Sequence, residues 1–428
     1  MSQSSDWSGL SGRRALLAVA IVCAVVQMTS ATLQTRSFDT PNAATWMAQN
    51  LARDGELSVA GLRAHQLPAE AIYLAAGFKL LPERARRYLH VPVTVLFATA
   101  IAAVALVVGG SGLAIATGFI TSFDPFMIRH GPVWDDVMLA AAMEWSLFAL
   151  LLSLAARAPL VRVSRGLLMT LAGLAAVAAM ARSLSQVIIL VVATLVIGLP
   201  RFRSLRPAGF AVLIGFILAL GAWGTRNSIV LGSFEIGSTH DGEVLLRSNC
   251  RYTRQGIREL GMVGAFTKEC LTTDEEHLLN LPELEFNREL RSYALDYIAS
   301  NPVDVAQTAA FKLVVSLSGY DFAAPPMSLR NVIAVSSSLL TLVVGLCGLT
   351  LIWRQIDPSI ARQLFVLLCL STGALTLALL AIGPTGIRYR VGFSGFLYLG
   401  VALTVMHQMP LAWKRSRFVA GDPVNAVG

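Results

Sequence analysis

Carboxylates in two stretches of the sequence, both beside apolar runs, have the type and position needed for acid–base chemistry. Asp39 lies in the stretch RSFDTPNAATWMAQNLARDGEL, directly after an apolar run that starts near Ala15. A carboxylate at a helix N-terminus stays ionised, because unpaired backbone N–H groups and the helix dipole favour its charge. Such a group suits general-base catalysis on an acceptor hydroxyl or amine. The alternative is that Asp39 or Thr40 only caps a helix that starts at Pro41.

The second group of acids lies in the stretch SFDPFMIRHGPVWDDVM, which holds Asp124, Asp135 and Asp136 close to the ends of apolar runs. Capping of a helix that starts near Val137 explains these acids equally well. Glu144 differs, because it lies about two turns inside the next apolar run, where an ionisable group is a functional candidate by default. Pairing with an arginine, or a water-filled cavity, would also account for Glu144.

Arginines accompany these acids. Arg182 separates two apolar runs, Arg226 follows another, and the stretch TGIRYR carries Arg388 and Arg390. The planar guanidinium group binds two phosphate oxygens at once. Acids and arginines gathered at the depth of lipid headgroups therefore predict a lipid-linked phosphate as the substrate.

Other site chemistries find little support in the sequence. It contains no Walker loop, no CxxC pair and no HExxH motif, and its six histidines are scattered, which argues against a histidine-based metal cluster. A divalent cation bound by carboxylates stays open. Cys250 and Cys270 share one polar segment, and a disulfide between them would contribute about 3 kcal/mol in an oxidising compartment. Two free thiols are the alternative.

The elements that must position these residues are membrane helices. The chain of 428 residues is 55% hydrophobic and 14% charged, with a mean hydropathy of +0.63. Soluble domains carry about 25% charged residues. About ten apolar runs, most of them near the length that crosses a bilayer, alternate with polar loops. They cover residues 15–33, 88–108, 111–123, 137–156, 166–181, 184–200, 208–224, 331–353, 363–382 and 391–409.

The basic residues set the expected orientation. The net charge is +8, but the lysines and arginines stand at the ends of apolar runs and form no stripe for nucleic acid. Many fall on alternate loops, which by the positive-inside rule are cytoplasmic. We expect a multi-pass protein of the bacterial inner membrane, with a retained first helix and cytoplasmic tails at residues 1–14 and 410–428. Transmembrane regions at 15–224 and 331–409 flank a periplasmic segment at 225–330.

Two polar segments outside the cytoplasm are expected to be helical. The first outer loop, residues 34–87, predicts interfacial helices at 41–54, ended by Gly55, and at 68–81. Trp46, Tyr73 and Phe78 are their expected anchors at headgroup level. The segment 225–330 predicts a helix broken at Pro302.

Four stretches, in this order, resemble the GT-C glycosyltransferases, specifically bacterial members similar to aminoarabinose transferase and protein O-mannosyltransferases. The most specific is LGAWGTRNSIVLGSFEIGSTHDGEVLLRSN. The others are the first outer loop with RSFDTPNAATWMAQNLARDGEL and LPAEAIYLAAGFKLLP, the stretch GPVWDDVMLAAAMEWSLFALLL, and ALDYIASNPVDVAQTAAFKLV followed much later by IRYR. The resemblance implies an all-α GT-C bundle of about ten transmembrane helices.

The resemblance also implies roles for individual residues. Asp39 matches the catalytic aspartate, Asp136, or else Asp135, matches a second outer acid, and Arg388 with Tyr389 matches a late motif near the donor phosphate. Two departures leave the donor and the acceptor open: Thr40 stands where many relatives have a second acid, and HQLPAE replaces a Lys-Pro-Pro.

The expected activity is inverting transfer of a sugar from a polyprenyl-phosphate donor to a glycan, lipid or protein at the periplasmic face. Asp39 would be the base, and Arg388, Tyr389, Arg226 and Arg182 would bind the donor phosphate. No cofactor is certain and no nucleic-acid partner is expected. The alternatives are a transporter or flippase of lipid-linked saccharides, and a non-catalytic scaffold for polysaccharide assembly.

Overall fold

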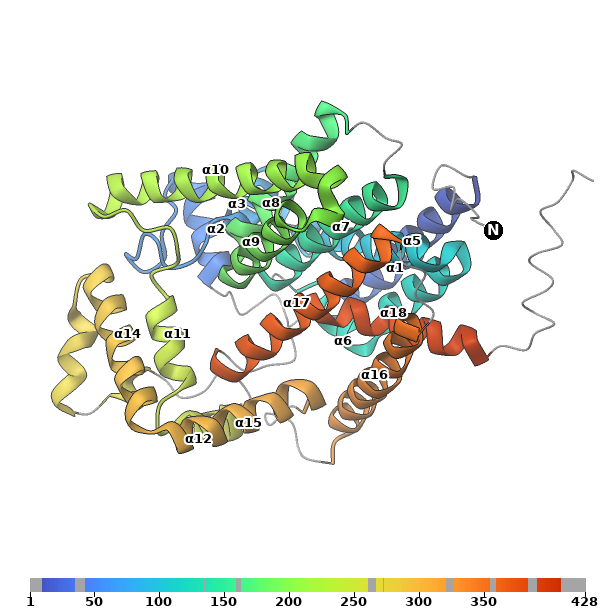
Figure 1. Cartoon of the computed structure of the whole chain (residues 1–428). Coiled ribbons are helices and arrows are strands. Elements are labelled where there is room, and N and C mark those ends of the chain that lie inside the picture. Colours follow the sequence, from blue (N-terminus) through green and yellow to red (C-terminus); the bar gives the residue numbers. More distant parts are fainter. Residues whose placement is uncertain are drawn as a thin grey trace, which may run out of the picture.

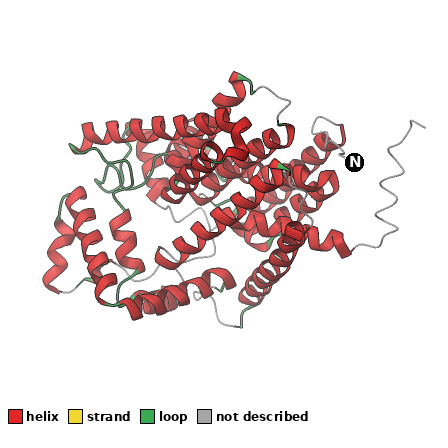
Figure 2. Ribbon diagram, viewed as in Figure 1, coloured by secondary structure: helices red, strands yellow, loops and turns green. Residues whose placement is uncertain are grey.

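The computed structural model describes residues 10–34, 43–133, 136–158, 163–260, 267–271, 273–320, 327–354, 359–383 and 391–408. Within these ranges the regular elements are helices, without a strand (Figures 1 and 2). Seven helices in this part of the chain are long and apolar enough to cross a membrane. They are α1 (Leu10–Leu33), α5 (Val91–Phe123), α7 (Asp136–Arg157), α10 (Arg206–Leu231), α16 (Leu329–Arg354), α17 (Ile360–Ile382) and α18 (Val391–Gln408).

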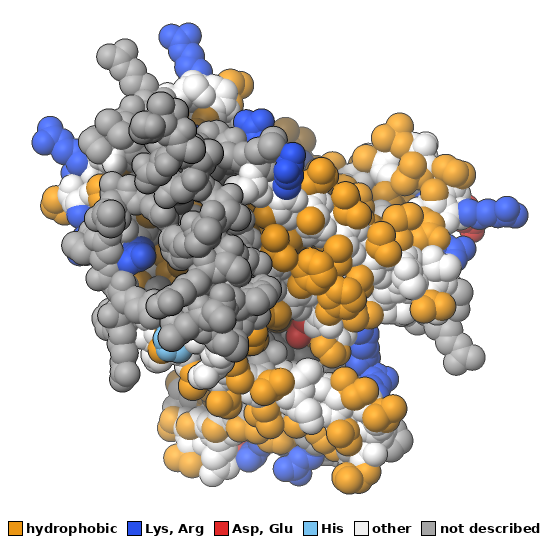
Figure 3. All heavy atoms as spheres, turned by 90° about the vertical axis from the view of Figure 1, so that its right-hand side faces the viewer, with side chains coloured by type: hydrophobic (Ala, Val, Ile, Leu, Met, Phe, Trp, Pro, Cys, Tyr) orange, Lys and Arg blue, Asp and Glu red, His pale blue; other side chains and the backbone are white. Residues whose placement is uncertain are grey.

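Two shorter apolar helices, α8 (Arg165–Ala181) and α9 (Ser183–Gly198), pack against each other and against α10, which follows the short helix η2 (Pro200–Leu205). Each predicted apolar run thus falls on a helix, and the chain is a multi-pass membrane protein. The number of crossings and their direction stay predictions. Apolar side chains cover much of the described surface in Figure 3, and lysine and arginine side chains lie mostly toward its edges.

Helix α5 reverses direction at Gly110. The Thr94 hydroxyl donates to the Gly131 carbonyl at 2.7 Å. A straight helix would place Phe123 about 43 Å from Thr94, and the eight residues to Gly131 span at most about 29 Å. Gly110 has φ 81° and ψ −174°, a backbone conformation open essentially only to glycine. The two halves of α5 therefore run back to back, as the separate runs 88–108 and 111–123 predict.

This reversal can be tested with a single methyl group. Gly110→Ala should lower the free energy of unfolding by about 1–3 kcal/mol, because alanine would be strained at this φ and ψ. The measurement is thermal unfolding of the purified protein in detergent. Gly173→Ala in α8 is the matched control, since a Cβ there meets nothing within 4 Å. Equal stability of both variants would contradict the reversal.

Helix α7 lies at the centre of the bundle. Nearly all of its side chains between Val137 and Ala155 are buried, and it contacts α5, α8, α17 and α18. Trp145 packs against Phe148 and Phe396, and its indole N–H donates to the Gly392 carbonyl at 2.8 Å. These contacts fix the start of α18 beside the first half of α7.

The first outer loop folds as α2 (Ala43–Asp54), α3 (Ala69–Leu80) and a short α4 (Glu83–Arg86), which confirms its two predicted helices. The prediction that Phe78 anchors the loop in headgroups is wrong, whereas Tyr73 is half-buried and its role stays a prediction. Phe78 is buried with Met47 and Leu89, and the Tyr73 hydroxyl donates to the Leu89 carbonyl. Phe78 faces inward because α3 packs on α2 and on the residues that precede α5. Trp46 is exposed.

The second outer segment has a small core of its own. It contains α11 (Asp241–Ser248), α12 (Thr253–Leu260), α13 (Thr267–Cys270), η3 (Thr273–Asn280), α14 (Glu283–Ser300) and α15 (Pro302–Ser318). Cys250 and Cys270, the pair singled out by the sequence, form a disulfide beside Leu246 and Leu290. Helix α14 ends and α15 begins at the predicted break before Pro302.

Helix α15 buries three polar residues and exposes several apolar ones. Thr308, Lys312 and Ser316 are buried, whereas Val303 and Val314 are 69% and 66% exposed. The Lys312 ammonium group donates to the carbonyls of Ser248 and Gly383, at 2.9 and 3.0 Å. A helix in water shows the reverse pattern. Because α15 also packs against the apolar helices α16 and α17, this pattern predicts that its outer face lies against hydrocarbon.

A spin label can test where the outer face of α15 lies. In a protein with the exposed Cys347 replaced by serine, a nitroxide on Ala310→Cys should collide more often with oxygen than with a water-soluble nickel complex. Arg288→Cys on α14 is the control, and its label should show the opposite preference. Equal access of nickel to both labels in liposomes would place α15 in water.

Candidate active site

Several helix ends meet at one end of the bundle, which we call the rim. The side chain of Gln34, at the end of α1, donates to the Ile128 carbonyl in α6 (Pro125–His130) at 3.0 Å. Thr94, in the first turn of α5, is bonded to Gly131, and α7 begins five residues later at Asp136. The rim thus joins the end of α1 and the start of α5, which flank the first outer loop, to α6 and the start of α7.

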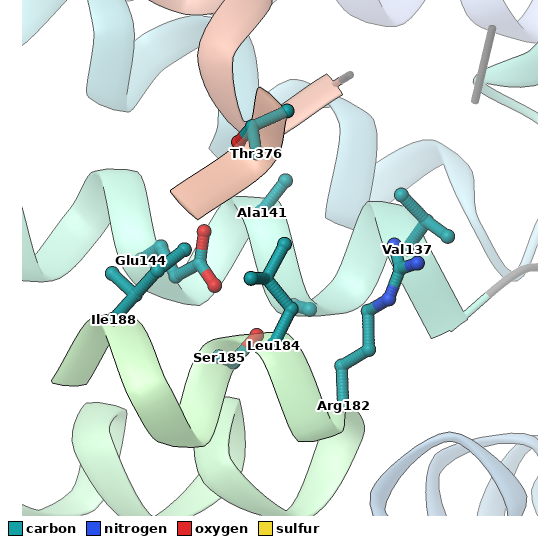
Figure 4. Close-up of a pocket in the computed structure, with 10 residues that line it drawn as sticks. Val137, Ala141, Glu144, Arg182, Leu184, Ser185, Ile188 and Thr376 are labelled. Carbon is teal, nitrogen blue, oxygen red and sulfur yellow. The ribbon is translucent and has the colours of Figure 1, made fainter. Parts of the chain in front are cut away.

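Arg182 reaches the rim from a break between two helices. It separates α8 from α9 and has an extended backbone, with φ −159° and ψ 141°. Its guanidinium group lies near Val137, in the first turn of α7 (Figure 4). Asp136, half-buried, immediately precedes Val137. The structure therefore brings Arg182 and Asp136, two of the predicted site residues, to the same end of the bundle.

A pocket opens beside Arg182, between α7, α9, α17 and α18. Its polar side chains are Glu144, Ser185 and Thr376, and alanine and branched aliphatic side chains complete the wall (Figure 4). Glu144 is only 3% exposed, and its carboxylate lies toward Ser185 (Figure 4). Glu144 is therefore a buried carboxylate beside a cavity of about 10 Å³, about enough for one water molecule, and the sequence singled it out only as an acid inside an apolar run.

Four predicted site residues lie outside the described part of the chain. They are Asp39, Asp135, Arg388 and Tyr389. Described residues next to them do reach the rim, since Gln34 precedes the interval that holds Asp39, and Gly392 follows the interval that holds Arg388 and lines the pocket. Their roles stay predictions.

Arg226 is engaged in holding the first outer loop. Its guanidinium group donates to the carbonyls of Arg63 and Leu57, at 2.7 and 3.2 Å, and lies 4.9 Å from the centre of the Trp223 ring. The Glu283 carboxylate, from α14, accepts the backbone N–H groups of Arg63 and Ala64. These contacts tie the loop to α10 and to the outer segment, so a phosphate would have to compete with them for Arg226.

A second polar cluster, absent from the sequence prediction, joins the first outer loop to the outer segment. The imidazole rings of His65 and His240 lie 4.1 Å apart, and His240 Nδ1 lies 2.9 Å from Glu243. Burial, followed by the nearby His240, lowers the pKa of His65 to about 4. Burial acts to raise the pKa of Glu243, but its contacts with His240, Thr267 and Arg247 outweigh burial and lower it to about 2.

The outer segment is also attached beside Arg182. The Ser183 hydroxyl donates to the Asp241 carboxylate at 3.5 Å. Burial raises the pKa of Asp241, against the opposing effect of His240 and Arg291. Ser183, which follows Arg182, is thus bonded to Asp241, which follows His240 in the sequence. This bond attaches the outer segment to the rim.

A buried acid–histidine pair also escaped the sequence analysis. His90 Nε2 lies 2.6 Å from Glu70, and both side chains are almost fully buried between α3 and the start of α5. The only signal in the sequence is a single polar residue in each of two apolar stretches, which does not reveal that they meet. As for metals, no group of three His, Cys, Asp or Glu side chains among the described residues could hold an ion.

The low pKa of half-buried His65 predicts how the stability of the protein changes in acid. The ordinary pKa of histidine is about 6.5, so between that pH and about 4 the unfolded chain binds a proton that folded His65 does not. The folded state therefore loses stability as the pH falls through this range. The unfolding temperature should fall less between pH 7 and 4.5 in His65→Gln than in the wild type. His407→Gln controls for the loss of one histidine, and a response of His65→Gln as large as the wild type's would refute the assignment.

Solved structures with a similar fold are known, although no sequence match is found. No protein-family model and no curated protein sequence matches the chain. A solved structure of the archaeal oligosaccharyltransferase AglB from Archaeoglobus fulgidus, in complex with an inhibitory peptide and a dolichol-phosphate, matches with a TM-score of 0.54 and 11% identity. The match covers 98% of this chain and 53% of that chain.

A second structure of the Archaeoglobus fulgidus oligosaccharyltransferase, tethered to an acceptor peptide with an NVT sequon, matches with a TM-score of 0.55 and 12% identity over 95% of this chain and 51% of that one. The chain therefore spans about half the length of these structures. Its fold is similar to that of about half of this archaeal oligosaccharyltransferase. The likeness concerns the fold alone, and membership of the GT-C family and of its bacterial subgroup stays a prediction.

Proposed function

We propose that this chain is an integral membrane glycosyltransferase that takes a sugar from a polyprenyl-phosphate donor and passes it to an acceptor at the periplasmic face of a bacterial inner membrane. The observation that carries the proposal is the position of Arg182 at the rim, facing the first turn of α7, in a bundle whose fold is similar to part of an oligosaccharyltransferase. An arginine at the end of a helical bundle, beside a buried polar pocket, suits a lipid-borne anion.

In the proposed reaction Asp39 removes a proton from an acceptor hydroxyl or amine. The acceptor atom attacks the anomeric carbon from the side opposite the phosphate, so the configuration inverts as the bond between that carbon and the phosphate oxygen breaks. The polyprenyl phosphate leaves with both electrons of that bond. Arg182, with Arg388 and Tyr389, stabilises the negative charge that develops on the phosphate.

A lipid-linked donor is supported by the comparison. One of the matched archaeal structures holds a dolichol-phosphate and a peptide, and the same fold would present the same kind of lipid to the rim here. The acceptor is a cell-envelope glycan, a lipid or a protein. With the basic loops in the cytoplasm, as the positive-inside rule predicts, both chain termini would lie in the cytoplasm as well.

The proposed base can be tested in proteoliposomes. Asp39→Asn should lower the rate of sugar transfer from a radiolabelled polyprenyl-phosphate sugar by about 10²- to 10⁴-fold, because general-base catalysis contributes that much. Asp54→Asn, which changes an exposed aspartate at the end of α2, should keep the wild-type rate. An intact rate in a correctly folded Asp39→Asn protein would show that the base is another residue.

A further inference from the structure

Basic side chains gather where the first outer loop returns to the bundle. The stretch from Lys79 to Arg87 carries four basic residues and a single acid, Glu83. One of the four, Arg86, donates to two backbone carbonyls of the loop. Lys79, Arg84 and Arg87 form no salt bridge within the described part of the chain. These three cations are therefore available to an anion from outside the protein.

The basic stretch ends at the boundary of the membrane. Tyr88, the next residue, shares a hydrogen bond with Thr32 in the last turn of α1, with 3.1 Å between the two hydroxyl oxygens. Helix α5 begins three residues later, at Val91. Because α1 and α5 are both long and apolar enough to cross a bilayer, the place where one ends and the other begins lies near the level of the lipid headgroups. The Arg87 guanidinium group lies 5.9 Å from the centre of the Tyr88 ring, at the same level.

Helix α3 exposes apolar side chains beside these cations. Ile72 and Leu80 are 53% and 81% exposed, and Ala76 is exposed between them. Spaced four residues apart, the three lie along one side of the helix, which Lys79 shares, and we call them the apolar strip. The other side of α3 packs against α2. An exposed apolar strip with a lysine beside it is typical of a helix that lies in the headgroup layer and buries its apolar side in the hydrocarbon.

The predicted orientation adds a reason to expect an anionic partner. The first outer loop is expected outside the cytoplasm, on the side where loops carry few lysines and arginines. Cations that stand against this bias, at headgroup depth, face the phosphate groups of lipids. The planar guanidinium group of an arginine can bind two phosphate oxygens at once.

We propose that the apolar strip of α3 rests in the membrane surface, where Lys79, Arg84 and Arg87 bind the headgroup phosphates of anionic phospholipids. A partner protein is disfavoured, because it would have to reach the strip through a layer that lipids already fill. Lipids would then hold the first outer loop at a fixed depth, in addition to its contacts with α10 and the outer segment. The proposal is independent of sugar transfer, since none of these residues is assigned to the reaction.

A fluorophore on Ala76→Cys, in the protein with the exposed Cys347 replaced by serine, reports on this surface. The full-length protein is reconstituted in phosphatidylcholine bilayers that contain increasing amounts of phosphatidylglycerol with a nitroxide near the top of its acyl chain. This lipid should quench the fluorophore at a lower mole fraction than phosphatidylcholine with the same nitroxide. Lys79→Gln, Arg84→Gln and Arg87→Gln should each raise the required fraction of phosphatidylglycerol about fivefold, the value of one cation near a charged membrane surface.

Two controls test whether the effect is specific. Quenching by nitroxide phosphatidylcholine should be the same in all variants. Arg288→Gln, which removes an exposed arginine on α14, should leave the preference for phosphatidylglycerol unchanged. Unlabelled polyprenyl phosphate should displace the nitroxide phosphatidylglycerol no better than unlabelled phosphatidylglycerol does.

Three results would overturn the proposal. If neither lipid quenches the fluorophore, α3 lies away from the membrane surface. If both lipids quench equally, or if all three variants keep the preference of the parent protein, the cluster binds no anionic phospholipid. If polyprenyl phosphate displaces the labelled lipid at a much lower mole fraction, the cations bind the proposed donor instead.

Discussion

Side chains that donate hydrogen bonds to backbone carbonyls hold the rim together. Some of these carbonyls, such as those of Gly131 and Gly383, follow a helix end, where the helix supplies no partner and a bilayer offers no water. Gln27 donates to Met127, Thr94 to Gly131 and Trp145 to Gly392, each across a large distance in sequence. Arg226 in α10 donates in the same way to a carbonyl of the first outer loop, and Lys312 in the outer segment donates to the Gly383 carbonyl. These bonds fix where the candidate site residues stand.

Two arginines illustrate how the same residue type serves two purposes. Arg226 donates to two backbone carbonyls and lies over the Trp223 ring, and these contacts attach the first outer loop to α10. Arg182 projects from an extended residue between two helices toward α7 and lines a pocket. In the sequence, Arg226 follows an apolar run and Arg182 separates two of them, so the two look alike. Only the contacts in the folded chain show that Arg226 holds a loop and that Arg182 is a candidate for binding phosphate.

Hydropathy predicted the helices well because their lengths and apolar content are local properties of the sequence. The reversal at Gly110 and the break before Pro302 were also visible, since glycine can adopt a positive φ and proline has a fixed φ and no backbone N–H. The inward ring of Phe78, the Glu70–His90 pair and the buried polar residues of α15 were not. They depend on partners from other helices, which no local pattern reports. The roles of Asp39 and Arg388 lie outside what the described residues can decide.

Lys312 joins two parts of the molecule through one ammonium group. It is bonded to Ser248, next to the disulfide of the outer segment, and to Gly383, where α17 ends. Asn249 adds a parallel bond to the Ile382 carbonyl at 2.7 Å. Any displacement of the outer segment from the bundle must therefore either break the two bonds to Gly383 and Ile382 or pull the end of α17 with it, so the two regions move together.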